Sequence, residues 1–317
     1  MKVFGFVLAR KAEHSIALMC RVLEVARSGY HAWAARPMSA RGVEDARLTA
    51  RIRELHDKRR MVYGSPRIWA DLVVDDGERI GRKRVERLMR QAGLSGLITK
   101  KYTATTVRVP GVRIADDLLD RKFAASAPNR CWVADIIYLR TWEGWLYLVA
   151  VQDLYSRRIV GWSMADHLRT ELVTDALQMA LAHRRPDPGL IYHSDQGSQF
   201  VSLAFGQQAR RAGIAQSMGS RGDCFDNAVA ESFFATLNKE LIHRRSWPTR
   251  AELRTEVFDY IEVFYNRERR HSTLGQRSPV DFENSTLSPT NPALAASRLA
   301  SPSQIMSTTS SPAANAA

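Results

Sequence analysis

The sequence predicts an α/β protein in which a mixed sheet flanked by helices follows a smaller, helical and strongly basic region. Three observations support this. The first hundred residues show only helical periodicity, residues 131–164 contain three strand-like apolar runs, and helical and strand-like segments alternate after them. A chain of 317 residues is long enough for two domains.

The charge of the chain is unevenly distributed. The net charge is +13, and all of the excess lies in residues 1–113, which hold 24 Lys and Arg against 11 Asp and Glu. The remaining residues hold 22 of each kind. A basic module beside a neutral one is expected when one part of a protein holds a polyanion and the other acts on it. A solvated basic surface is the alternative explanation.

Other protein classes are excluded by composition. No apolar run approaches the ~20 residues of a membrane span, so no membrane partner is expected. The three cysteines, Cys20, Cys131 and Cys224, never form a Cys-x-x-Cys pair, and the N-terminus lacks the pattern of a secretory signal. We therefore expect a reduced, cytoplasmic location and no zinc site.

Residues 1–100 are expected to form a helical DNA-binding region. Apolar periodicity predicts helices at 15–27, 43–61, 65–72 and 82–90, with Gly29 ending the first, Arg59 facing outward and Ser65 capping the third. The helices predicted at 65–72 and 82–90 are short and are joined by a turn at 75–77. The helix at 82–90 is densely basic. This describes a helix-turn-helix whose second helix enters the major groove. An ordinary helical hairpin with a charged face is the alternative.

Residues 129–283 are expected to form the second domain. Apolar and β-branched runs predict a meander of three strands, followed by alternating helices and strands. The strands are expected at 131–139, 145–152, 158–164 and 190–192 and near Ile214, and the helices at 170–184, 203–212, 227–244 and 250–265. This is the element order of a ribonuclease-H-like fold. Residues 101–128 lose periodicity and are interpreted as a linker, and the polar residues 284–317 as a disordered tail.

Three carboxylates stand in unusual contexts. Asp135 interrupts an apolar strand, where an unpaired charge is costly. Asp195 comes directly after the later β-run that contains Ile191 and Tyr192. Glu231 flanks the buried stripe expected on its helix, which consists of Ala230, Phe233, Phe234, Leu237 and Leu241. Mg²⁺ takes such oxygen ligands, and two ions would activate a water or a 3′-hydroxyl for phosphoryl transfer. Asp153 and Asp226 are expected only to form a turn and an N-cap.

Several motifs carry a resemblance to a known family. Asp135, Asp195 and Glu231, with 35 residues between the last two, match the signature of retroviral-integrase-like transposases. The segments HSDQGSQ at 193–199, ESFF at 231–234 and YNRERRHS at 265–272 resemble the second-reading-frame product of the bacterial insertion-sequence-three (IS-three) family. YGSPRI at 63–68 and the basic segment after it resemble that family's helix-turn-helix. Ala134 and Ile137 depart from the family pattern, which has threonines there.

The resemblance implies a DNA transposase that cuts and joins strands at element ends by two-metal phosphoryl transfer, using Mg²⁺ or Mn²⁺. The implied partners are the terminal inverted repeats, target DNA, further copies of the chain on DNA, and a first-frame product joined by frameshifting. The implied location is the bacterial nucleoid. Two alternatives remain open, namely a catalytically inactive DNA-binding protein of the same fold and a hydrolytic ribonuclease-H-like nuclease.

Further residues are expected to support the site or to contact DNA. The expected catalytic and metal-binding residues are Asp135, Asp195 and Glu231, supported by His193, Gln199 and Asn227. For His193, orientation of a metal-bound water and simple packing are both open. The expected DNA contacts are Arg82, Lys83, Arg84, Arg87, Arg90, Lys239, Arg269 and His271.

Overall fold

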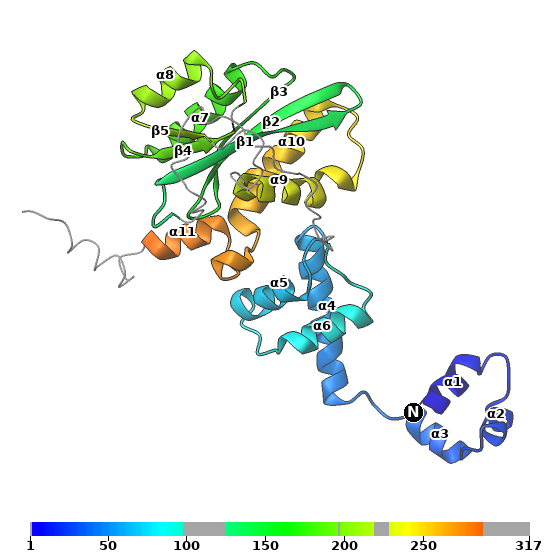
Figure 1. Cartoon of the computed structure of the whole chain (residues 1–317). Coiled ribbons are helices and arrows are strands. Elements are labelled where there is room, and N and C mark those ends of the chain that lie inside the picture. The colour runs from blue at the N-terminus through cyan, green and yellow to red at the C-terminus, as the bar shows by residue number, and fades with distance from the viewer. Residues whose placement is uncertain (1, 98–124, 196, 219–227, 288–317) are drawn as a thin grey trace, which may run out of the picture. The chain divides into compact units, whose positions relative to one another are not determined.

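The computed structural model describes residues 2–97, 125–195, 197–218 and 228–287 (Figure 1). The chain divides into two compact units, Met1–Gly96 and Leu97–Ala317, which are described separately below. Most of the expected linker, residues 101–124, and the expected tail from residue 288 onward lie outside the described residues. Among the described helices, none has the length and apolar character needed to cross a membrane.

The first unit begins with three short helices around a small apolar cluster. They are α1 (Lys2–Arg10), α2 (Ile16–Val22) and α3 (Arg27–Ala34). The single helix expected at 15–27 is wrong, because Glu24 takes a left-handed backbone conformation (φ 54°) and ends α2. Gly29 consequently lies inside α3 and is not a stop signal.

The rest of the first unit contains α4 (Ala40–Lys58), α5 (Ser65–Ala70), a π-helical turn η1 (Asp71–Asp75) and α6 (Arg82–Gln91). These helices bury the apolar stripes that the periodicity predicts, including Ile52 in α4 and Leu88 in α6. Gly93 follows α6 with a φ of 72°, a conformation that glycine adopts without strain.

Two details of this unit differ from expectation. Ser65 is the first residue of α5, and the N-cap position belongs to Gly64. Arg59, expected to face outward, is buried because its Nε donates to Oδ2 of the buried Asp71 at 2.8 Å. A buried guanidinium needs such a partner, and the sequence pattern does not reveal it.

The second unit is built on a five-stranded sheet of order β3-β2-β1-β4-β5. The strands β1 (Cys131–Thr141), β2 (Gly144–Asp153) and β3 (Ile159–Ala165) form the antiparallel meander. The strands β4 (Ile191–Ser194) and β5 (Ala215–Met218) add to it in parallel. The ribonuclease-H-like mixed sheet expected from the sequence is confirmed.

Helices cover both faces of this sheet (Figure 1). On one face, α7 (Glu171–Arg184) and α8 (Leu203–Arg211) pack against alternate residues of β1 such as Trp132 and Ala134. On the other face, α9 (Ala228–Glu240) packs its Val229 and Ala230 against Val133. The alternation of side chains along β1 thus assigns odd-numbered residues to the α9 face.

The C-terminal elements complete the α9 face. They are η2 (Ile242–Arg244), α10 (Arg250–Asp259), its π-helical continuation η3 (Tyr260–Glu268), η4 (Ser272–Leu274) and α11 (Pro279–Leu287). The Tyr265 hydroxyl of η3 accepts from Gln152 Nε2 of β2 at 2.9 Å. α11 continues past Asn284, where the disordered tail was expected to begin.

Glu283 of α11 fastens several elements together. Its carboxylate accepts from Arg184 at 2.8 Å, from the Ser156 hydroxyl at 2.7 Å and from Arg158 at 3.0 Å. Burial alone would raise the pKa of Glu283, but the hydrogen bonds from Arg184 and Ser156 outweigh it and lower that pKa.

Candidate active site

The pairing of β1 with β4 aligns two of the three carboxylates. Val133 of β1 lies opposite His193 of β4 in parallel register. Two residues further along each chain come Asp135 and Asp195, the latter directly after the last residue of β4. Because side chains alternate along a strand, both continue the side on which Val133 packs against α9.

Glu231 approaches the same face from the first turn of α9. The expected stripe of this helix is confirmed, since all five of its apolar residues are buried. Ala230 packs against Val133, and the neighbouring Glu231 is exposed at the rim of that contact. Two strands and one helix therefore bring three acids to one side of the sheet.

The electrostatics of Asp135 report this proximity. The pKa of Asp135 is raised to about 7, chiefly by burial and in addition by the negative charges of Asp195 and Glu231, while the hydrogen bond from the Ile136 N–H at 2.7 Å acts in the opposite direction. The pKa of Glu231 is also raised by burial. Mutual repulsion of this kind is what a bound cation relieves.

This shift predicts a pH-dependent effect on stability in metal-free protein. The pKa of Asp135 rises from 3.8 to about 7, so between these values the folded state binds more protons than the unfolded state. The free energy of unfolding therefore falls as pH rises through this range. Allowing for its partial exposure, Asp135→Asn should stabilise the protein by on the order of 2 kcal/mol at about pH 8 and not below about pH 4. Urea unfolding in a chelator at each of the two pH values measures the stability difference between variant and wild type. Equal midpoints at the higher pH would contradict the prediction.

The donor chemistry of the three acids suits a hard divalent cation, which prefers carboxylate oxygens and water. Within the part of the chain that the structure describes, no three His, Cys, Asp or Glu side chains are grouped closely enough to form a metal site as they stand. Asp195 is exposed, and its Oδ1 accepts from the Gly197 N–H at 3.1 Å. The acids thus share a face and an electrostatic field without forming a closed ligand set.

The expected supporting residues have other contacts. His193 is buried, and its Nδ1 lies 3.0 Å from the Ser217 hydroxyl of β5, which fits the packing interpretation. Gln199 donates its amide to the Leu168 carbonyl at 2.8 Å. Gln199 therefore fastens its loop to the segment before α7, and its supporting role beside the carboxylates stays a prediction. Asn227 lies outside the described residues.

One expected DNA contact is wrong. Arg269 is only 6% exposed, and its guanidinium forms two hydrogen bonds of 2.8 Å with the buried Glu240. A guanidinium held in this way cannot also reach a DNA phosphate. His271 is half-buried and sets its ring edge-on to Tyr265 at 5.0 Å, whereas Lys239 is exposed on α9.

The cations of α6 fall into two groups. Arg84 and Arg87 each bind Asp45 of α4 at 2.8 Å, and Arg90 binds Glu86 at the same distance. Arg82 and Lys83 are exposed and form no ion pair with any described residue. These two are the cations most available to a phosphate.

Asp153 is confirmed as a turn former. It is fully buried and accepts from the N–H groups of Asn129, Tyr155 and Ser156 at 2.7, 2.9 and 3.1 Å. Asp226, which was expected to be an N-cap, lies outside the described residues.

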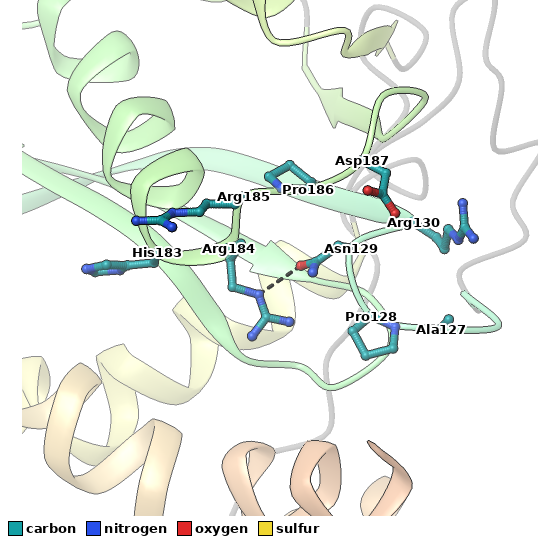
Figure 2. Close-up of a pocket in the computed structure, with 9 residues that line it drawn as sticks. All are labelled: Ala127, Pro128, Asn129, Arg130, His183, Arg184, Arg185, Pro186 and Asp187. Carbon is teal, nitrogen blue, oxygen red and sulfur yellow. Dashed lines mark hydrogen bonds between the residues drawn. The ribbon is translucent and has the colours of Figure 1, made fainter. Parts of the chain in front are cut away.

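Two hollows on the second unit were not anticipated. One, of about 380 Å³, lies where β1 and β4 begin, and there Arg184 donates to Asn129 at 2.8 Å (Figure 2). Because Asp195 follows the opposite end of β4, this hollow is separate from the acids. The other, of about 610 Å³, is lined by Tyr138, Trp142 and Trp145 of the β1–β2 hairpin. The sequence signals this second hollow only through Trp142 and Trp145, which flank the predicted turn at 143–144.

Family models match both units. Residues 125–224 and 231–287 match two models, each described as an integrase core domain, and residues 43–102 match an HTH-like domain. The integrase matches contain Asp135, Asp195 and Glu231, and the HTH-like match contains α5, α6 and all but the first three residues of α4.

Similar proteins cover nearly the whole chain. The transposase InsF for insertion sequence IS3A of Escherichia coli K12 is 40% identical over 286 residues, 90% of this chain and 99% of the relative. A 31 kDa protein of insertion element IS600 from Shigella sonnei, named as uncharacterized, is 40% identical over 83% of this chain and 97% of its own length.

Solved structures of viral integrases show a weaker likeness. A simian T-cell lymphotropic virus intasome chain aligns with a TM-score of 0.44 at 14% identity, over 81% of this chain and 80% of that chain. The HTLV-2 integrase catalytic core aligns with a TM-score of 0.38 at 16% identity, over 50% of this chain and 98% of its own.

Proposed function

Because the chain belongs to the transposases of IS3-type insertion sequences, we propose that Asp135, Asp195 and Glu231 are the catalytic carboxylates with which it cuts and joins DNA strands. The observation that supports this assignment best is the register of β1 and β4, which continues from Val133 and His193 to the two aspartates. Glu231 joins them from α9, and the charges of both neighbours raise the pKa of Asp135.

In this proposal the three acids hold Mg²⁺ or Mn²⁺, two ions in all. The bound metal would supply Lewis-acid stabilisation of the attacking and leaving oxygens. Asp135 must lose its proton to serve as a ligand, so metal affinity is expected to rise with pH up to about 7. Asp195 is exposed, and its Oδ1 accepts from the Gly197 N–H, so its Oδ2 would be the oxygen offered to a metal ion.

The strand-joining reaction separates this function from its alternatives. Purified protein is mixed with duplexes carrying the element's terminal inverted repeats, with target DNA and Mg²⁺. We expect element ends with a free 3′-hydroxyl to become covalently joined to target DNA. Cleavage without joining would favour a hydrolytic nuclease, and binding without either reaction would favour an inactive DNA-binding protein.

The DNA-binding role is proposed for the helical region at 1–100, and the catalytic role for the core at 129–283. We also propose that the protein assembles with further copies of itself on DNA in the nucleoid, and that a first-frame product contributes as a frameshift fusion. Light scattering of the protein with and without terminal-repeat DNA tests the assembly.

The exposed cations of α6 give a salt-dependence prediction. Replacing Arg82 and Lys83 together by alanine should reduce the slope of log affinity against log salt by about 1.8, because each phosphate that is no longer neutralised accounts for ~0.9. Arg47→Ala is the control, because Arg47 already binds Glu44 and Glu78. Fluorescence anisotropy with a duplex at several salt concentrations measures the slope. An unchanged slope in the double variant would place the phosphate contacts elsewhere.

A further inference from the structure

The second unit contains a groove whose lining the carboxylate chemistry does not explain. It has a volume of about 610 Å³ and lies between the β1–β2 hairpin and the C-terminal end of α9. We call it the aromatic groove and define it by Tyr138, Arg140, Trp142, Trp145, His243 and Trp247.

Three of its aromatic side chains are turned to solvent. Trp142 is 76% exposed, Tyr138 58% and Trp145 48%. The ring of Tyr138 stands edge-on to that of Trp145 at 6.4 Å. Large exposed aromatic surfaces gathered in a groove are typical of a binding site.

The groove is held rigidly. The backbone N–H of Trp142 donates to the Trp247 carbonyl at 3.0 Å. Arg250 Nε donates to the backbone carbonyl of Trp145 at 3.0 Å. Trp247 is buried, with its indole N–H bonded to the Ile242 carbonyl at 2.9 Å. The backbone that carries Trp142 and Trp145 is therefore fixed before any ligand arrives, which lowers the entropic cost of binding.

The charges of the groove favour an anion. Arg140 lies over the Trp145 ring at 6.0 Å, His243 is exposed nearby, and no acidic side chain is among the described residues that line the groove. Glu143, at the hairpin turn, already accepts from the Arg250 N–H at 2.8 Å. Stacking surfaces combined with cations are the elements with which proteins hold single-stranded nucleic acid.

The groove also leads away from the three carboxylates. Along β1, the backbone of Tyr138 is three residues beyond that of Asp135, about 10 Å at ~3.3 Å per residue, although the two side chains leave opposite faces of the strand. Asn238, which also lines the groove, is seven residues beyond Glu231 on α9, about 10 Å at ~1.5 Å per residue and on the same side of the helix. β4 pairs with β1 only as far as Val133, so no described strand covers the edge of β1 between the acids and the groove.

We propose that the aromatic groove binds unpaired nucleotides of the DNA strand that is cut, from about three to about seven nucleotides away from the phosphodiester at the carboxylates, taking ~3.4 Å per nucleotide. Their bases would stack on Trp142 and Trp145, and their phosphates would face Arg140 and His243. This proposal rests on the function proposed above and adds that the substrate is unpaired near the cut.

Binding without divalent metal tests the proposal independently of catalysis. The full chain is titrated, in a chelator, against a single strand of about 16 nucleotides, a blunt duplex, and a duplex with an unpaired end of about seven nucleotides. Trp142→Ala and Trp145→Ala should each weaken binding of the first and third ligands by about tenfold. The affinity of each variant for blunt duplex should stay within about twofold of the wild-type affinity, because the phosphate contacts of the basic unit remain.

Matched variants complete the design. Trp142→Phe and Trp145→Phe keep a stacking surface and should restore most of the affinity. Phe258→Ala removes a half-exposed aromatic ring elsewhere in the same unit and should have no effect. Single-strand affinity unchanged in the double alanine variant would overturn the proposal. So would loss of self-association in light scattering with DNA affinity intact, because the groove would then be a protein contact. A failed carboxylate assignment would appear only in cleavage assays.

Discussion

Glu231→Gln should abolish metal-dependent cleavage of the element's ends while leaving the fold intact. Glutamine keeps the size of the side chain at the rim of the contact between α9 and β1 but removes the charge that holds a divalent ion. We expect cleavage to fall by at least about a thousandfold, the loss of several kcal/mol of transition-state stabilisation. Asp135→Asn and Asp195→Asn should behave alike, and combining them should add little, because residues that act as one unit are not additive. Gel analysis of 3′-end cleavage with Mg²⁺ measures the effect.

Two control variants make this result specific. Asp175→Asn removes an exposed acid from α7, on the opposite face of the sheet, and should cleave normally. Asp153→Asn weakens a buried carboxylate that accepts three backbone N–H groups, so it should lower stability at most. Near-normal cleavage by Glu231→Gln, together with a folded but inactive Asp153→Asn variant, would show that the wrong carboxylates had been assigned.

Arg269→Met should destabilise the second unit by about 3–5 kcal/mol, because it leaves the buried Glu240 without its counter-charge. Glu240 binds both Arg269 and the Tyr260 hydroxyl, each at 2.8 Å, deep between α9 and η3. Urea unfolding measures the loss, and the DNA affinity of the folded variant should equal that of wild type.

A double variant tests the same pair from the other side. Arg269→Met combined with Glu240→Leu removes both charges and should recover much of the stability, since an apolar pair can replace a buried ion pair. If Arg269→Met left the unfolding midpoint unchanged and weakened DNA binding, the side chain would be a DNA contact after all.

Periodicity was sufficient for most of the fold. The strands and helices of the second unit bury the residues that the pattern assigns to the core, such as Trp132, Leu172 and Leu237. It was insufficient where backbone conformation or a distant partner decides. The left-handed turn at Glu24 splits a stretch with continuous helical periodicity. Arg59 resembles any other surface cation until Asp71 is brought against it.

The candidate site divides in the same way. Local context alone singles out Asp135, Asp195 and Glu231 among the acids of the second domain as the candidates for catalysis. The register that aligns the aspartates joins segments about sixty residues apart, and no local pattern shows it. The basic residues around Arg269 predict a DNA contact, whereas its actual partner Glu240 lies on a different helix and no local pattern indicates it. The aromatic groove arises only when the hairpin meets α9.

The position of Glu283 bears on how copies of such a gene lose activity. This acid lies in the last described helix, yet it neutralises Arg184 and Arg158, which come from α7 and from the segment before β3. A stop codon or frameshift shortly before position 283 would leave all three proposed catalytic carboxylates encoded. It would, however, remove the only acid that the described structure pairs with the guanidinium groups of Arg184 and Arg158. Such a copy would be silenced by misfolding rather than by loss of chemistry, so an intact set of three acids does not by itself identify an active element.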